Sequence, residues 1–191
     1  MKIINAVAVL FFSVILLKAN AQSDIPNGFR KGTIVTADGN LQAGFVKDNM
    51  RNSASIAFIP SPDQKKKNYS GADLKSLEID GSKYICIKGD FFKVLCEGEL
   101  NFLQKCSDAS QKPSYNGTEV IFTNGTEGKL NDYFIYNAAD KQLKLISKKN
   151  VDEVIASSFA GCSEAIDKAR NANGDIYQLK DAVIVYNNRN K

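Results

Sequence analysis

Residues 74–106, LKSLEIDGSKYICIKGDFFKVLCEGELNFLQKC, give the clearest indication of the fold. It contains four short segments rich in β-branched and aromatic residues, separated by turn residues. Asp80-Gly81 readily takes the positive φ of a tight hairpin turn, and Gly98 separates the last two segments. The pattern predicts four consecutive antiparallel strands, over residues 74–80, 83–88, 91–97 and 100–106.

The segments on either side have the same character. Asp38-Gly39 joins two further strand segments, and Pro60 ends a third whose apolar residues alternate onto one face. These outer strands are predicted over residues 29–37, 41–47, 53–59, 118–123, 132–136 and 143–146. About nine strands at this spacing predict an antiparallel β-rich roll or a partly open barrel.

The pattern becomes helical after residue 147. Asn150-Val151-Asp152-Glu153 matches a capping box at a helix start, Gly161 ends that helix, and Ser163 can cap a second. A third is predicted from the helical spacing of Ile176, Leu179, Val183 and Tyr186. Helices this short are not stable alone, so we expect two or three C-terminal helices packed on the sheet. The expectation is one α+β domain over residues 22–191, β-rich over 29–147 and helical over 150–188. A small separate helical lobe is the alternative.

Residues 1–21 have the layout of a secretory signal peptide. Lys2 gives a positive start, an apolar run extends from Ala6 to Leu17, and Ala19 and Ala21 stand where a signal peptidase reads small residues. The run is well short of the roughly 20 residues that a spanning helix needs. We therefore expect an exported protein that begins at Gln22, with no membrane span in the mature chain.

Composition argues against several classes of function. The formal net charge is only +4 at pH 7, and the signal segment supplies part of it, so we expect no nucleic-acid partner. The chain has no histidine, which removes the commonest zinc ligand and the base of Ser-His-Asp and Cys-His catalysis. We accordingly expect no cofactor and no bound metal.

A series of short motifs extends along most of the mature chain. They are Lys31-Gly32-Thr33-Ile34 with Gly44-Phe45-Val46, ADLKSL (residues 72–77), FFKVLCEGELNFLQ (residues 91–104), Asp132-Tyr133-Phe134 and VIVYN (residues 183–187). In this succession the chain resembles a group of uncharacterised exported proteins of Bacteroidetes, some of which continue into an outer-membrane β-barrel. The resemblance implies the envelope of a diderm bacterium, either the periplasm or the cell surface. It brings no established activity and no catalytic residues.

Four cysteines in an exported chain permit two disulfides in any of three pairings, or they can all be small buried residues. They are Cys86, Cys96, Cys106 and Cys162. The bridge that we expect is Cys106–Cys162, because it would close a long loop between the strands and the helices.

Two groups of residues are candidates for a binding surface. Lys65-Lys66-Lys67 falls in a predicted exposed loop or sheet edge, where lysines prevent edge pairing or contact an anionic partner. Tyr84 and Tyr133 belong to the main aromatic concentration, which fills the core or forms a platform for a carbohydrate or peptide.

Two functions are compatible with these features. The first is a non-catalytic envelope module that binds an envelope protein or a glycan, for example by accepting an extended peptide at a sheet edge. The alternative is a hydrolase of cell-surface glycan that uses two facing carboxylates. Its acids would come from Asp73, Glu97, Glu99 and Asp132. We favour binding, because the sequence contains no assembled nucleophile and base.

Overall fold

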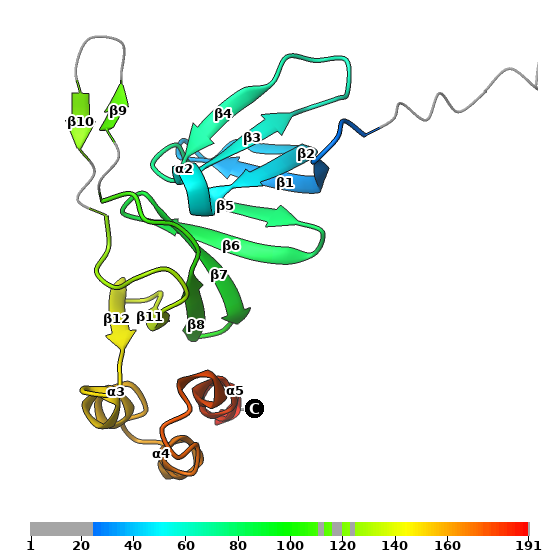
Figure 1. Ribbon diagram of the computed structural model, residues 1–191. Helices are drawn as coiled ribbons and strands as arrows, with labels where there is room; N and C mark the ends of the chain where they lie inside the picture. The colour runs from blue at the N-terminus through cyan, green and yellow to red at the C-terminus, as the bar shows by residue number, and fades with distance from the viewer. Residues whose placement is uncertain (1–24, 111–112, 116–119, 123–124, 191) are drawn as a thin grey trace, which may run out of the picture.

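The structure is a computed structural model that describes residues 25–110, 113–115, 120–122 and 125–190. Within these residues, ten strands form one antiparallel sheet in the order β12-β11-β8-β7-β6-β5-β1-β2-β3-β4. The predicted α+β fold, a partly open β-rich roll followed by short helices, is confirmed (Figure 1). The predicted signal peptide, residues 1–21, lies outside the described residues.

The first half of the sheet curls into a roll. Its elements are β1 (Arg30–Thr36), β2 (Leu41–Asn49), α2 (Met50–Ser53), β3 (Ser55–Ile59), β4 (Lys67–Ser70), β5 (Leu74–Ile79) and β6 (Ser82–Ile87). A bridge between Gly71 and Gly89 brings the end of β4 to the turn after β6. Because side chains alternate along each strand, one face supplies the interior of the roll, where Ile34, Val46 and Phe58 pack together.

The second half of the sheet carries the helices on one face. Its strands are β7 (Asp90–Cys96), β8 (Leu100–Lys105), β11 (Tyr133–Asn137) and β12 (Gln142–Ile146), and the helices are α3 (Val151–Ser158), α4 (Ser163–Arg170), the 3₁₀ helix η2 (Ile176–Gln178) and α5 (Leu179–Asn188). Phe102 and Ile135 of the sheet share a core with Phe159 and Val183 of the helical segment. The helices therefore pack on the sheet, as expected.

The start of the helical segment differs from the prediction. The capping box is wrong, because the Asn150 side chain makes no cap hydrogen bond to α3. Its carboxamide oxygen instead accepts hydrogen bonds from the Ser147 amide (2.7 Å) and hydroxyl (2.8 Å), and its amide group donates to the Leu145 carbonyl (2.9 Å). The Asn150 side chain therefore stabilises the turn after β12 and is not available to cap α3. Ser163 is likewise the first residue of α4 rather than its cap.

The end of α5 is attached to the turn between β7 and β8. The Asn187 side chain accepts a hydrogen bond from the Leu100 amide (3.0 Å) and donates one to the Leu100 carbonyl (2.8 Å). One nitrogen of Arg189 lies 2.8 Å from each carboxylate oxygen of Glu99. A Cβ atom on Gly98 would lie 2.2 Å from the Asn187 side chain, so only glycine leaves room for this contact.

A buried ion pair holds the connection between β8 and β11, which includes the hairpin of β9 (Pro113–Tyr115) and β10 (Val120–Phe122). The Lys105 ammonium lies 3.2 Å from the Asp90 carboxylate, and both side chains are fully buried. Asp90 also accepts hydrogen bonds from Ala109 and Thr126. Lys105 donates to the carbonyls of residues 126–128. The ion pair thus fixes both ends of the connection to the sheet.

Candidate functional site

The four cysteines, all within the described residues, are free thiols. The predicted Cys106–Cys162 bridge is therefore not formed. Cys106 follows the far end of β8 and packs against the core of the roll, whereas Cys162 lies in the core beneath the helices. That helical core contacts β8 at Leu100 and Phe102. Even Phe102 is four residues before Cys106, roughly 13 Å along a strand, which is beyond the reach of a disulfide.

Cys86 and Cys106 also stand too far apart for a bridge. Cys86 is the register partner of Phe91, and the Cys106 amide donates to the Phe91 carbonyl from the other side. Two strand spacings, about 9.6 Å, therefore separate the two backbones. Burial raises the pKa of the Cys86 thiol to about 12, and burial also raises the pKa of Cys96 and of Cys106.

The two tyrosines proposed as a platform are not on one surface. Tyr84 is only 9% exposed and belongs to the core of the roll. Tyr133, on β11, stacks on Phe102 at 5.4 Å between ring centroids and contacts Tyr177 edge-on at 6.0 Å. Its ring packs against the helix-covered core. The structure thus gives both rings packing roles.

The four acids considered for hydrolysis have separate structural partners. Asp73 accepts hydrogen bonds from the Ser70 amide and hydroxyl, and Asp132 accepts one from the Lys129 amide. Glu97 pairs with Lys83. The Arg189 guanidinium lowers the pKa of Glu99 through a hydrogen bond. These contacts hold turns and element ends together.

The lysine cluster lies at a sheet edge. Lys65 and Lys66 are exposed in the loop before β4, and Lys67 is the first residue of β4. β4 is the last strand in the sheet order and pairs only with β3 among the described residues (Figure 1). The Lys67 ammonium sits 4.6 Å from the centre of the Tyr69 ring. The sequence signal for an edge is therefore confirmed, although β4 itself was not predicted.

A groove lies beside β4. It has a volume of about 430 Å³ and is bounded by β4, by Ala72 and Asp73, and by the turn between β1 and β2. On the turn side, Asp38 accepts hydrogen bonds from the Thr36 hydroxyl and the Asn40 amide group, and the Thr36 bond is the main reason that the pKa of Asp38 is lowered. Asn68, which lines this groove, was not predicted from the sequence. Its importance depends on the direction of its backbone amide and carbonyl, and not on its side chain.

The direction of the Asn68 backbone follows from its neighbour. The Ser70 amide donates to Asp73, outside the sheet, so Ser70 points its backbone groups away from β3. In an antiparallel pair, residues two apart point their amide and carbonyl to the same side. The amide and carbonyl of Asn68 therefore face the groove, while those of Lys67 and Tyr69 face β3.

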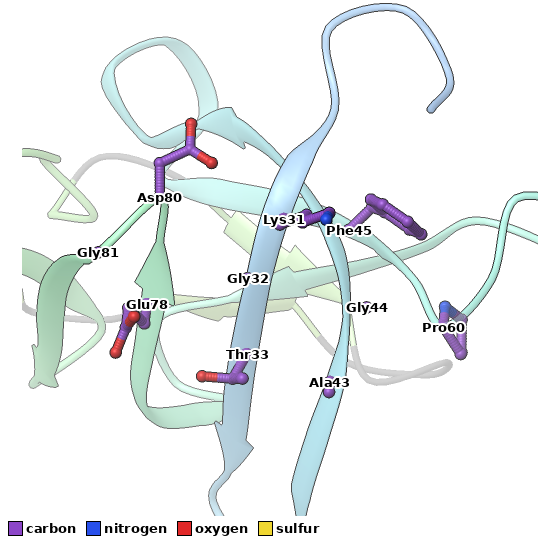
Figure 2. A pocket seen from close by; sticks show the side chains of 10 residues that line it. All are labelled: Lys31, Gly32, Thr33, Ala43, Gly44, Phe45, Pro60, Glu78, Asp80 and Gly81. Carbon is purple, nitrogen blue, oxygen red and sulfur yellow. The ribbon is translucent and has the colours of Figure 1, made fainter. Parts of the chain in front are cut away.

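A second hollow, of about 510 Å³, lies on the outer side of the roll and is open to solvent (Figure 2). Gly32 and Gly44, register partners on β1 and β2, form its floor. Phe45 and Pro60 stand on one side of this floor, and Thr33 and Glu78 on the other. The glycines are required here, because a Cβ atom would lie 2.3 Å from the Glu78 carbonyl at Gly32 and 2.4 Å from the Ile59 carbonyl at Gly44.

In the described part of the chain, no helix is long and apolar enough to span a membrane. Among the same residues, no cluster of three or more Cys, Asp or Glu side chains has the geometry to hold a metal ion. Comparisons with family models, curated proteins and solved structures found no match to the chain.

Proposed function

We propose that the protein is an exported, non-catalytic binding module of the cell envelope, and that it takes an extended segment of another envelope protein as an added strand along β4. The observation that carries this proposal is the outward amide and carbonyl of Asn68, which open onto the groove of about 430 Å³ beside β4. An unpaired strand edge recognises an extended peptide through main-chain hydrogen bonds.

The edge available to such a segment is short and has defined ends. At one end, the Ser70 carbonyl accepts a hydrogen bond from the Asp73 amide, which closes that part of the edge. At the other end, Lys65 and Lys66 are exposed. A segment in the groove pairs with Asn68, and its continuation passes the lysines.

Charge favours an acidic segment at the lysine end. Lys65 and Lys66 have no ion-pair partner among the described residues, so they are available to carboxylates of a ligand. The groove acids Asp38 and Asp73 already accept hydrogen bonds within their own turns. The preferred partner therefore has an extended stretch with acidic residues at one end.

The test compares Asn68→Pro with Asn68→Thr in retention of proteins from the envelope fraction. Proline removes the outward amide and is tolerated at an edge position whose N–H faces away from the sheet, whereas threonine keeps that amide. We expect a protein that is retained by the wild type and by Asn68→Thr, and that is at least about tenfold depleted with Asn68→Pro, the equivalent of about 1.4 kcal/mol.

A second variant, Lys65→Glu/Lys66→Glu, tests the charge argument without touching the strand. It should reduce retention of the same protein, and the reduction should shrink at high salt because exposed charges are screened. A partner that is retained equally by Asn68→Pro contradicts strand addition at β4. A charge-reversed variant that retains the partner unchanged contradicts the acidic segment.

A further inference from the structure

The outer hollow of Figure 2 has a chemistry different from that of the β4 groove. Cross-strand pairing places Lys31 beside Phe45, and Thr33 between Ala43 and Glu78. The result is one apolar side, Phe45 with Pro60, with the Lys31 side chain beside Phe45, and a polar side that carries the Thr33 hydroxyl and the Glu78 carboxylate (Figure 2). The floor between them is bare backbone at Gly32 and Gly44.

We infer that this hollow is a second binding site, one that takes a neutral sugar unit of a glycan. A pyranose ring has an apolar C–H face, which packs on an aromatic ring, and hydroxyl groups at its rim, which both donate and accept hydrogen bonds. Phe45 supplies the aromatic surface, and its ring is only partly buried. Thr33, Glu78 and Lys31 supply acceptors and donors around the same floor.

The charge around the hollow fits a neutral ligand. Lys31 contributes one positive charge and Glu78 one negative charge. Asp80, at the edge, faces Arg30 across 3.8 Å. The charges therefore balance, and nothing in this set selects a strongly acidic or basic molecule.

The two acids at the hollow do not form a catalytic pair. Figure 2 shows the side chains of Glu78 and Asp80 pointing away from each other. A glycosidase holds its two carboxyl groups facing across the scissile bond. The hollow therefore holds the sugar and leaves it intact.

The experiment is a titration of the ¹⁵N-labelled protein with four neutral oligosaccharides: maltotriose, cellotriose, mannotriose and N,N′-diacetylchitobiose. With at least one of them, we expect amide shifts at Gly32, Gly44 and Thr33. Phe45→Ala should weaken that binding by about tenfold or more, because the sugar loses its aromatic contact. The matched control is Leu41→Ala, on the same strand, whose side chain is 71% exposed and lies outside the hollow.

Glu78→Gln is a second test that remains valid if Phe45→Ala does not fold. It keeps the shape of the side chain and changes only its hydrogen bonding. It should weaken binding while the spectrum stays that of the folded protein. If no sugar shifts these amides, or if the shifts cluster elsewhere, the site is overturned. Shorter sugars released during the titration would overturn the binding-only assignment. These outcomes do not depend on Asn68, so the test is independent of strand addition at β4.

Discussion

Lys105 and Asp90 form a buried ion pair where β7 begins and β8 ends. Both are fully buried, and their hydrogen bonds reach both ends of the connection between β8 and β11. A buried ion pair gains little over an apolar pair, but removal of one partner leaves an uncompensated charge. The arrangement is stable because both buried side chains also have hydrogen-bond partners in the connection, more than because their charges attract.

Lys105→Met should therefore destabilise the protein by about 3–5 kcal/mol, measured as the free energy of unfolding in urea. The exposed Lys129→Met is the matched control and should stay within about 0.5 kcal/mol of the wild type. Addition of Asp90→Asn to Lys105→Met should recover part of the loss, since the buried charge is then gone. A loss below about 1 kcal/mol in Lys105→Met would show that the carboxylate finds another partner.

The thiols make a second prediction at the scale of single residues. Burial raises the pKa of Cys86 from 9.0 to about 12, so its reactive thiolate is rare in the folded protein. We expect Cys86 to be labelled slowly by N-ethylmaleimide at pH 8. After unfolding in guanidinium without reductant, all four cysteines should react, as counted by intact mass. Two labels instead of four would reveal a disulfide.

The same pKa shift sets a pH dependence. The folded state favours the neutral thiol, so the stability that this preference contributes is complete below about pH 9. It is lost as the pH rises toward about 12, through the range where the unfolded thiol already ionises.

At the scale of elements, α5 is held by specific contacts as well as by apolar packing. Asn187 satisfies both backbone groups of Leu100, and Arg189 binds Glu99 next to it. The sequence motif VIVYN (residues 183–187) lies within α5 and ends one residue before the helix does, and its asparagine is the residue that reaches the β7–β8 turn. The motif therefore marks a helix-to-sheet attachment.

Asn187→Ala should cost about 1–3 kcal/mol in the free energy of unfolding, because the amide and carbonyl of Leu100 lose their partner. Asn188→Ala changes the adjacent, exposed residue of the same helix and should have little effect. Equal stabilities of the two variants in a urea titration would contradict the attachment.

The elements also show what the sequence could predict. Regular alternation and turn pairs located β5 to β8, and Asp80 and Gly81 indeed take φ values of 46° and 75°. β4 was missed because Lys67 to Ser70 is short and polar and has only one apolar residue facing inward. The capping box failed because Asn150 has a competing partner in Ser147, which local sequence does not rank.

For the candidate site, the sequence supplied the lysines but not the residue beside them. A basic run near two prolines indicates an exposed edge, and Lys67 lies on one. Asn68 has no chemical signature, because its importance comes from the direction of its backbone amide. The prediction of Tyr84 as a surface residue is wrong, because the curl of the sheet places its ring inside the roll. Local sequence does not reveal that curl.

At the scale of the whole molecule, the roll closes only in part. Among the described residues, one isolated bridge, between Gly71 and Gly89, brings the end of β4 to the turn after β6, while Asn68 faces a groove. A closed barrel would have no such edge, and the lysines around it would have no strand to protect. The proposed function depends on this incomplete closure more than on any one side chain.

The most direct test of this account is amide hydrogen exchange along β4, measured by NMR on the dilute protein alone. The amides of Lys67 and Tyr69 face β3 and should be protected, while the Asn68 amide between them should exchange at least about tenfold faster. That alternation is the signature of an edge open to an added strand. Asn68 protected as strongly as Tyr69 would mean that the edge is already paired, and strand addition at β4 would be contradicted.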